Sequence, residues 1–151
     1  MLRKTSIDTI MIHCTATPPR REVSVRELDG WHKARNFETY TDPETGKKTY
    51  AGYHLLVHID GSYERIRPDE HRGQHCPQCN MNNRAVSICY VGGVDTDNRP
   101  CDTRTDAQKR TLLSLIRTMR AKYPDARIVG HRDYAPKACP SFDAKSEYKN
   151  I

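Results

Sequence analysis

The sequence lacks any long apolar run: no stretch approaches the ~20 residues that a membrane-spanning helix needs. Hydrophobic residues fill only 36% of the 151 positions, below the usual ~45–50%, which predicts a small core under a wide polar surface. No signal-peptide core is present either, because Asp8 interrupts the stretch after Arg3 and Lys4. We therefore expect a chain that is made in the cytoplasm and has no membrane segment.

Negatively charged residues are fewer than positively charged ones: the chain has 19 Asp and Glu and 25 Lys and Arg, which gives a formal charge of +6. This balance predicts an anionic partner, and composition alone leaves nucleic acid, a membrane surface and a cell-wall polymer open. Only two Phe and one Trp are present, whereas nucleic-acid grooves interleave basic with aromatic side chains, so we expect no nucleic-acid partner. No repeat or linker appears, and the length fits a single domain over residues 1–151. We expect it to be a monomer.

Short apolar runs of strand length alternate with two helical patterns along the chain. The expected strands are residues 7–13, 53–59, 62–66, 85–91 and 126–130. Asp60-Gly61 is a strong hairpin signal between the second and third of these, so the sheet cannot be wholly parallel. The fold class that follows is α/β, a single domain with a central mixed β-sheet flanked by α-helices.

Ser24 and Thr105 each open a capping-box pattern that marks the start of a helix. The first helix is expected to cover the sheet through Trp31. The second should bury a stripe at helical spacing that consists of Leu112, Leu115, Ile116 and Met119. Residues 36–50 contain proline, glycine and charged residues, and are expected to form an exposed, extended loop.

Three potential metal ligands stand at informative places in this pattern. His13 ends the first expected strand, His131 follows the last one, and Cys139 lies eight residues further on. Strand ends can bring such side chains together at one sheet edge, where two imidazoles and a thiolate suit zinc and leave a fourth position open for water. The residues alone also fit hydrogen-bonded structural histidines and a small buried thiol.

Several motifs follow one another in order along nearly the whole chain: residues 12–17, 25–28, 31–33, 52–54, 60–61, 91–95, 112–116, His131 and 135–143. Together they resemble the zinc-dependent N-acetylmuramoyl-L-alanine amidases of the type 2 family, in particular the compact phage enzymes that are called lysozymes. The last motif is the most specific, because its proline, lysine and cysteine recur in the register of the family's second metal cluster. The same superfamily includes peptidoglycan recognition proteins, some of which lack the metal cysteine and only bind.

The resemblance implies roles for individual residues. It gives one catalytic Zn²⁺ the ligands His13, His131 and Cys139, makes Tyr53 and Lys137 catalytic, and places His75 on the substrate side. The implied reaction is hydrolysis of the amide between N-acetylmuramic acid and L-alanine in peptidoglycan, by a cell-wall lytic enzyme such as a phage or prophage endolysin. A non-catalytic peptidoglycan-binding module of the same fold is the alternative, which Cys139 disfavours. The enzyme would act on the wall after release or export by an unknown route.

Two segments depart from the family pattern. Residues 41–48 are an apparent insertion that could reshape one wall of the groove. Cys76 and Cys79 form a C-x-x-C pair, for which a disulfide or two free thiols is preferred over a second metal site. The three cysteines outside the pair and the metal site are expected to be structural. Arg72 and Arg84 are expected to be solvated, with pairing to a stem-peptide carboxylate as the functional alternative.

Overall fold

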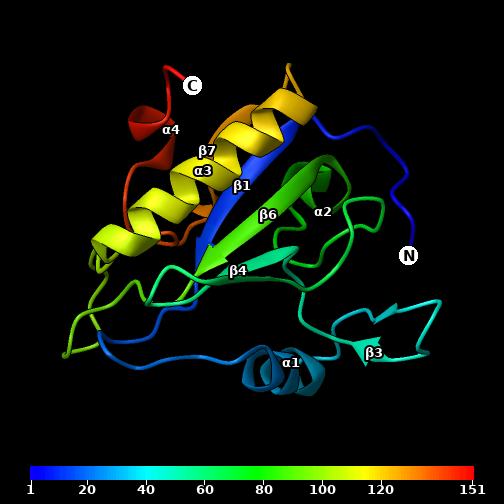
Figure 1. Cartoon of the computed structure of the whole chain (residues 1–151), viewed down its shortest axis with the longest axis horizontal. Helices are drawn as coiled ribbons and strands as arrows, with labels where there is room; N and C mark the ends of the chain where they lie inside the picture. Colours follow the sequence, from blue (N-terminus) through cyan, green and yellow to red (C-terminus); the bar gives the residue numbers. More distant parts are fainter.

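The computed structural model describes all of residues 1–151, and Figure 1 shows the helices arranged around a central sheet. The strands are β1 (Thr9–Cys14), β2 (Tyr40–Thr41), β3 (Lys48–Thr49), β4 (Leu55–Val57), β5 (Tyr63–Arg65), β6 (Ala85–Tyr90) and β7 (Arg127–Gly130). The helices are α1 (Val25–Ala34), α2 (Met81–Arg84), α3 (Asp106–Lys122) and α4 (Ala144–Glu147), with 3-10 turns at Gln78–Asn80 and His131–Asp133. No helix is both long and apolar enough to cross a membrane.

The central sheet has five strands in the order β5-β4-β6-β1-β7. Strand β1 runs parallel to both β6 and β7, and β4 runs parallel to β6. Only β4 and β5 are antiparallel, joined by the turn at Gly61, whose φ of +87° is one that glycine adopts without strain. The mixed α/β fold class and the hairpin are therefore confirmed. The strand expected over residues 53–59 is shorter, and Tyr53 precedes it.

Helix α3 covers one face of the sheet, where the largest apolar cluster lies. This cluster contains 17 buried residues, among them Ile10 and Ile12 of β1 and Ile88 of β6. Figure 1 shows α3 running across the central strands. The predicted stripe of Leu112, Leu115, Ile116 and Met119 is buried here, so that prediction is confirmed. Thr105 makes the complete capping box that fixes where α3 begins.

The opposite face of the sheet carries smaller clusters and more polar atoms. Successive strand residues point to opposite faces, so Met11 and His13 of β1 lie here while their neighbours face α3. A cluster of seven buried residues joins Leu56 of β4 to Leu28 of α1. Helix α1 thus covers only part of this face, and the uncovered part leaves room for a groove.

Ser24 caps the start of α1 as expected, because the Ser24 side chain accepts a hydrogen bond from the Glu27 N–H at 3.1 Å. The expectation that Trp31 covers the sheet is wrong: Trp31 is 37% exposed, and Leu28 and His32 form the buried side. These two residues are four positions apart and share one side of the helix. Trp31 lies beside that stripe, with the Arg21 guanidinium 5.7 Å from its ring.

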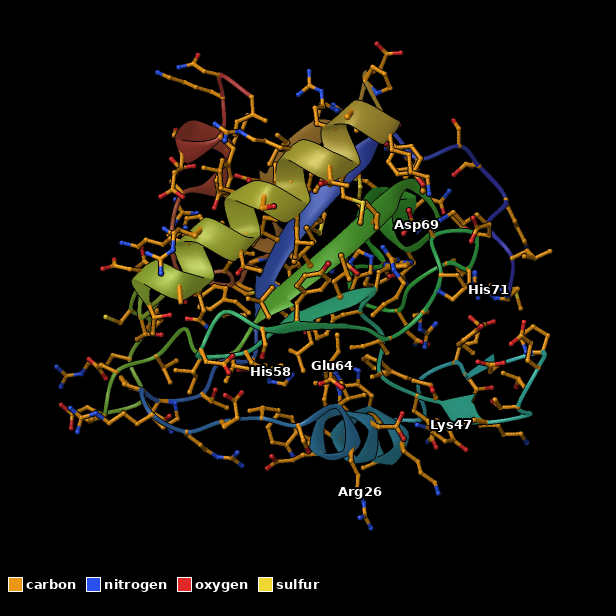
Figure 2. All side chains as sticks on the ribbon, viewed as in Figure 1. Arg26, Lys47, His58, Glu64, Asp69 and His71 are labelled. Atoms are coloured by element: carbon orange, nitrogen blue, oxygen red, sulfur yellow. The ribbon has the colours of Figure 1, made fainter.

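The expected loop over residues 36–50 contains a small antiparallel hairpin of β2 and β3. Its turn is closed by Asp42, whose backbone carbonyl accepts from the Gly46 N–H at 2.8 Å. The apparent insertion 41–48 is therefore an ordered projection beside α1, near Lys47 in Figure 2. The prediction of a wholly extended loop is corrected, since Asp42 and Gly46 together provide a turn that lets the flanking residues pair.

Candidate active site

His13 occupies the next-to-last position of β1 and is fully buried on the groove face. Its Nδ1 lies 3.7 Å from Cys139 Sγ, and its ring centroid lies 4.6 Å from that of His131. His131 follows β7 directly, and the parallel pairing of β1 with β7 brings the ends of these two strands together. The sheet thus places both histidines at one edge, as the sequence predicted.

Cys139 is brought to the same place by the loop after β7. The Arg132 N–H donates to the Cys139 carbonyl at 2.7 Å, and the Cys14 N–H donates to Cys139 Sγ at 3.3 Å. One ligand atom from each of His13, His131 and Cys139 lies within 4.8 Å of the others. Two imidazole nitrogens and one sulfur this close together fit a zinc ion, since zinc prefers such N and S ligands in a small coordination shell.

The electrostatics of the three residues also suit a cation. Burial lowers the pKa of His13 well below its usual value, with smaller contributions from His75 and His131. Burial and then Lys137 lower the pKa of His131 to about 4. Both rings are therefore neutral near pH 7, the form that ligates metals. A hydrogen bond with Cys14, followed by burial, raises the pKa of the Cys139 thiol, so this thiol needs a nearby cation to become a thiolate.

A groove of about 450 Å³ opens over these atoms. Tyr53 and Lys137 both line it, together with His131 and Cys139. The Tyr53 ring lies 4.9 Å from the His13 ring, and burial, followed by the neighbouring thiols, raises the pKa of its hydroxyl well above the usual value. Lys137 is exposed, and its ammonium is close enough to lower the pKa of both histidines.

His75 lies deeper than a residue that only meets substrate. Its Nδ1 is 3.0 Å from His13 Nε2, and the residue is 8% exposed. Its other ring nitrogen, Nε2, is the one buried side-chain nitrogen or oxygen without a hydrogen-bond partner. Because a histidine that ligates a metal is oriented by what its second nitrogen contacts, His75 is placed to hold the His13 ring. The predicted substrate contact of His75 stays a prediction.

The structure also places the two arginines and the five other cysteines that the sequence analysis considered. Arg72 pairs with Glu38 and Arg84 pairs with Asp8 at 2.8 Å, and the two arginine side chains stay 26% and 27% exposed, so each is a partly solvated charge held in an ion pair. Cys76 is buried and Cys79 is exposed, and both are free thiols. Among the three cysteines that were expected to be structural, Cys101 is exposed, while the other two are buried. The correction for Cys101 follows from its place in a surface loop that adds nothing to the core.

His32 is a groove residue that the sequence analysis did not single out. It lines the groove beside Tyr53, with the two ring centroids 5.4 Å apart. The Gly52 N–H donates to His32 Nδ1 at 2.8 Å. Its spacing of four residues from Leu28 is the signal that places it on the inner side of α1.

The sequence model of the N-acetylmuramoyl-L-alanine amidase family matches residues 3–142. The chain therefore belongs to the N-acetylmuramoyl-L-alanine amidase family and is an amidase that acts on peptidoglycan. The endolysin of Escherichia phage T7 is 37% identical over 143 residues, which are 95% of this chain and 86% of that protein. The endolysin of Enterobacteria phage T3 is 36% identical, over 94% of this chain and 85% of that protein.

Solved structures agree with this assignment. The N-acetylmuramoyl-L-alanine amidase LysC from Clostridium intestinale URNW superposes with a TM-score of 0.72 at 25% identity, covering 93% of this chain and 80% of that one. Wild-type Drosophila PGRP-LB gives a TM-score of 0.73 at 18% identity, covering 99% of this chain and 84% of that one. At that identity the likeness shows a shared fold. The resemblance to the amidase and peptidoglycan recognition superfamily is confirmed.

Proposed function

We propose that the chain is a zinc-dependent cell-wall lytic enzyme of the endolysin type. It hydrolyses the amide bond between the lactyl group of N-acetylmuramic acid and L-alanine of the stem peptide. His13, His131 and Cys139 hold one Zn²⁺, and Tyr53 and Lys137 are the catalytic residues. The observation that carries the proposal is the group of two imidazoles and a thiol at the base of a groove that Tyr53 and Lys137 also line.

A zinc ion bound by these residues supplies a Lewis acid for the scissile carbonyl and makes hydroxide available near neutral pH. In the overall reaction, water adds to the carbonyl carbon and the C–N bond breaks. The nitrogen takes a proton and leaves as the free amino group of L-alanine, while the muramic acid keeps a carboxylate.

Lys137 and Tyr53 have different roles: Lys137 stabilises charge and Tyr53 orients a reactant. The Lys137 ammonium stabilises the negative charge that develops on the carbonyl oxygen as water adds. Burial holds the pKa of the Tyr53 hydroxyl well above its usual value, so it keeps its proton at neutral pH and orients a reactant by donating a hydrogen bond. His75 keeps the His13 ring in place through the contact of 3.0 Å between their nitrogens.

Digestion of purified sacculi tests the proposal directly. We expect mass spectrometry to find released stem peptides that begin with a free L-alanine amino group, and metal analysis to find one zinc per chain. Products in which only sugar bonds are cleaved would refute the amidase reaction. Zinc-loaded protein that binds sacculi and leaves them uncut would favour the binding module instead.

We also propose that the enzyme works as a monomer and reaches the wall after release or export from the cytoplasm. All the residues of the site come from one chain, which supports the first part. Light scattering at assay concentration should give the mass of one chain, and a dimer mass would contradict it. Added protein should lyse permeabilised cells and leave intact cells unaffected if a barrier separates it from the wall.

A further inference from the structure

Tyr90 is the last residue of β6 and is fully buried on the α3 face of the sheet. It belongs to the cluster of 17 buried residues, which Cys139 borders. Its hydroxyl donates a hydrogen bond to the backbone carbonyl of Pro140 at 2.6 Å. No other group donates to that carbonyl, so a buried acceptor in the Cys139 loop depends on Tyr90 alone.

This hydrogen bond holds the residue that directly follows Cys139. Because the ring of a proline restricts its φ, few rotations separate the Pro140 carbonyl from the Cys139 backbone. The Pro140 ring also packs against Gly130, since a Cβ at position 130 would lie 2.7 Å from Pro140 Cδ. Gly130 directly precedes His131. The Tyr90 hydroxyl therefore helps to set where two of the proposed zinc ligands lie relative to each other.

The backbone of Tyr90 is bonded to the strand that carries the third proposed ligand. Tyr90 is the register partner of Cys14 in the parallel pairing of β6 with β1. Its carbonyl accepts a hydrogen bond from the Thr15 N–H at 3.0 Å. The end of β1, with His13, is thus held beside Tyr90 by the sheet. One residue therefore connects the strand of His13 to the loop of Cys139.

The next residue of the loop shows that this stretch is held from two sides. Ser141 has a φ of +68°, which residues other than glycine rarely adopt. Its Oγ donates to the Gly93 carbonyl at 2.7 Å. A backbone conformation of this kind persists only where the surrounding contacts enforce it. The Tyr90 hydroxyl bonds the loop just before Ser141, and the Gly93 carbonyl bonds Ser141 itself.

We propose that Tyr90 is a positioning residue that raises the affinity of the protein for zinc by holding the Cys139 loop in place. The inference rests on the proposed zinc site. Residues that orient metal ligands typically contribute about 10–100-fold to metal affinity. The physical reason is that a loop that is already ordered loses little entropy when the metal binds. Tyr90 does not line the groove, so it acts on the metal through this loop.

Tyr90→Phe tests the proposal, because it removes the hydroxyl and keeps the ring. Tyr148→Phe is the matched control. Tyr148 is buried in the same cluster, and both tyrosine rings lie 6.2 Å from the Phe142 ring, measured between centroids. The Tyr148 hydroxyl, however, accepts a hydrogen bond from Arg104 and does not contact the Cys139 loop. Both variants should lower the melting temperature of the metal-free protein by about 2–6 °C, since each loses a buried hydrogen bond.

The decisive measurement is the dissociation constant for zinc, determined by competition with a chromophoric chelator. We expect Tyr90→Phe to raise this constant about tenfold and Tyr148→Phe to leave it within about twofold of wild type. A residue that only stabilises the fold would lower the melting temperature and leave zinc affinity as it is. Equal dissociation constants for wild type and Tyr90→Phe, or equal rises in the two variants, would therefore overturn the proposal.

Ser141→Ala decides the question if metal-free Tyr90→Phe does not fold. Ser141 is partly exposed and its hydroxyl holds the same loop, so this variant should fold and bind zinc more weakly than wild type. An unchanged dissociation constant in Ser141→Ala would then overturn the inference. Wild-type protein that binds no zinc would refute the proposed metal site as well, whereas tight wild-type binding with an unaffected Tyr90→Phe refutes this inference alone.

Discussion

The two faces of the central sheet are built from the same strands and yet carry different chemistry. The α3 face holds the cluster of 17 buried residues, to which β1 and β6 contribute mainly aliphatic side chains such as Ile10, Ile12 and Ile88. The groove face holds clusters of seven and five residues, and fully buried His13 and Ser87 lie among them. Strand alternation alone separates the two sets.

The difference shows how a small chain can divide folding from catalysis. Burial of apolar area contributes about 25 cal/mol per Å², so the α3 face supplies most of the favourable free energy of folding. Buried polar groups cost free energy unless they are paired, so the groove face contributes less to the free energy of folding than the α3 face. Substitutions on the groove face should therefore change activity more than stability, and those on the α3 face the reverse.

The largest effect is expected at Cys139. Cys139→Ser replaces the thiol by a hydroxyl that does not ionise near pH 7, so zinc content and turnover should both fall below detection. The melting temperature of the metal-free form should change little, because Cys139 only borders the large cluster. Cys101→Ser, at an exposed thiol, is the matched control and should keep zinc and activity. A Cys139→Ser variant that still turns over would remove this residue from the metal site.

Lys137→Ala should act on rate alone. Loss of a group that stabilises charge on the reacting oxygen typically costs about 10²–10³-fold in kcat. Zinc content and the melting temperature should stay at wild-type values, because Lys137 is exposed. Steady-state kinetics with metal analysis checks this, and Lys145→Ala serves as a control for loss of one surface charge. Equal loss of zinc in Lys137→Ala and Cys139→Ser would mean that Lys137 is structural.

A substitution on the opposite face should give the opposite pattern. Leu112 is fully buried on α3, and Leu112→Ala should lower the free energy of unfolding by about 3 kcal/mol through lost burial and the cavity left behind. Urea unfolding measures the loss, with the exposed Arg117→Ala on the same helix as control. The specific activity of the folded fraction should be unchanged. A matching fall in kcat would show that the two faces are not independent.

The smallest effect concerns pH. Asp69 lies away from α1 in Figure 2 and is 4% exposed. Burial acts to raise its pKa, but hydrogen bonds from Tyr123, Arg65 and Lys122 outweigh it and lower the pKa to about 2. The stability from this shift is present above pH ~4 and is lost as the pH falls toward 2, an effect of about 2 kcal/mol.

Asp69→Asn should therefore lower stability at neutral pH and flatten the acid limb of the unfolding curve. Chemical denaturation between pH 2 and pH 6 measures the slope. Asp125→Asn removes an exposed carboxylate instead and should leave the slope as it is in the wild type. Parallel curves for wild type and Asp69→Asn would show that Asp69 does not set the acid stability. Because Asp69 accepts hydrogen bonds from Arg65 at the end of β5 and from Tyr123 just after α3, this test also probes how the end of α3 is held against the edge of the sheet.

The sequence predicted the α3 face well, since strand alternation and a helical stripe both report burial on one side. It predicted α1 less well. Trp31 has the largest apolar side chain of that helix, yet Leu28 and His32 face inward, because the direction of the stripe depends on how the helix docks. The hairpin β2–β3 was missed because its strands are only two residues long, too short for a periodic pattern.

For the site, the strand ends and the family resemblance predicted that five residues meet: His13, His131, Cys139, Tyr53 and Lys137. The structure places them together at the groove. The sequence could not predict which other residues contact and orient these side chains. The pairing of His75 with His13, of His32 with Gly52 and of Arg72 with Glu38 all join residues from separate segments. Contacts of this kind depend on the folded path of the chain and leave no local spacing in the sequence.

The contact between His13 and Cys139 joins residues 126 positions apart in the chain. During synthesis, β1 emerges early, but its histidine has no partner ligands until β7 and the loop after it have left the ribosome. Closing a loop of this length also carries an entropic cost that only the assembled sheet can offset. A nascent or truncated chain that ends before residue 131 therefore carries only one of the three proposed metal ligands, and we expect lytic capacity to arise only after residue 139 has been added.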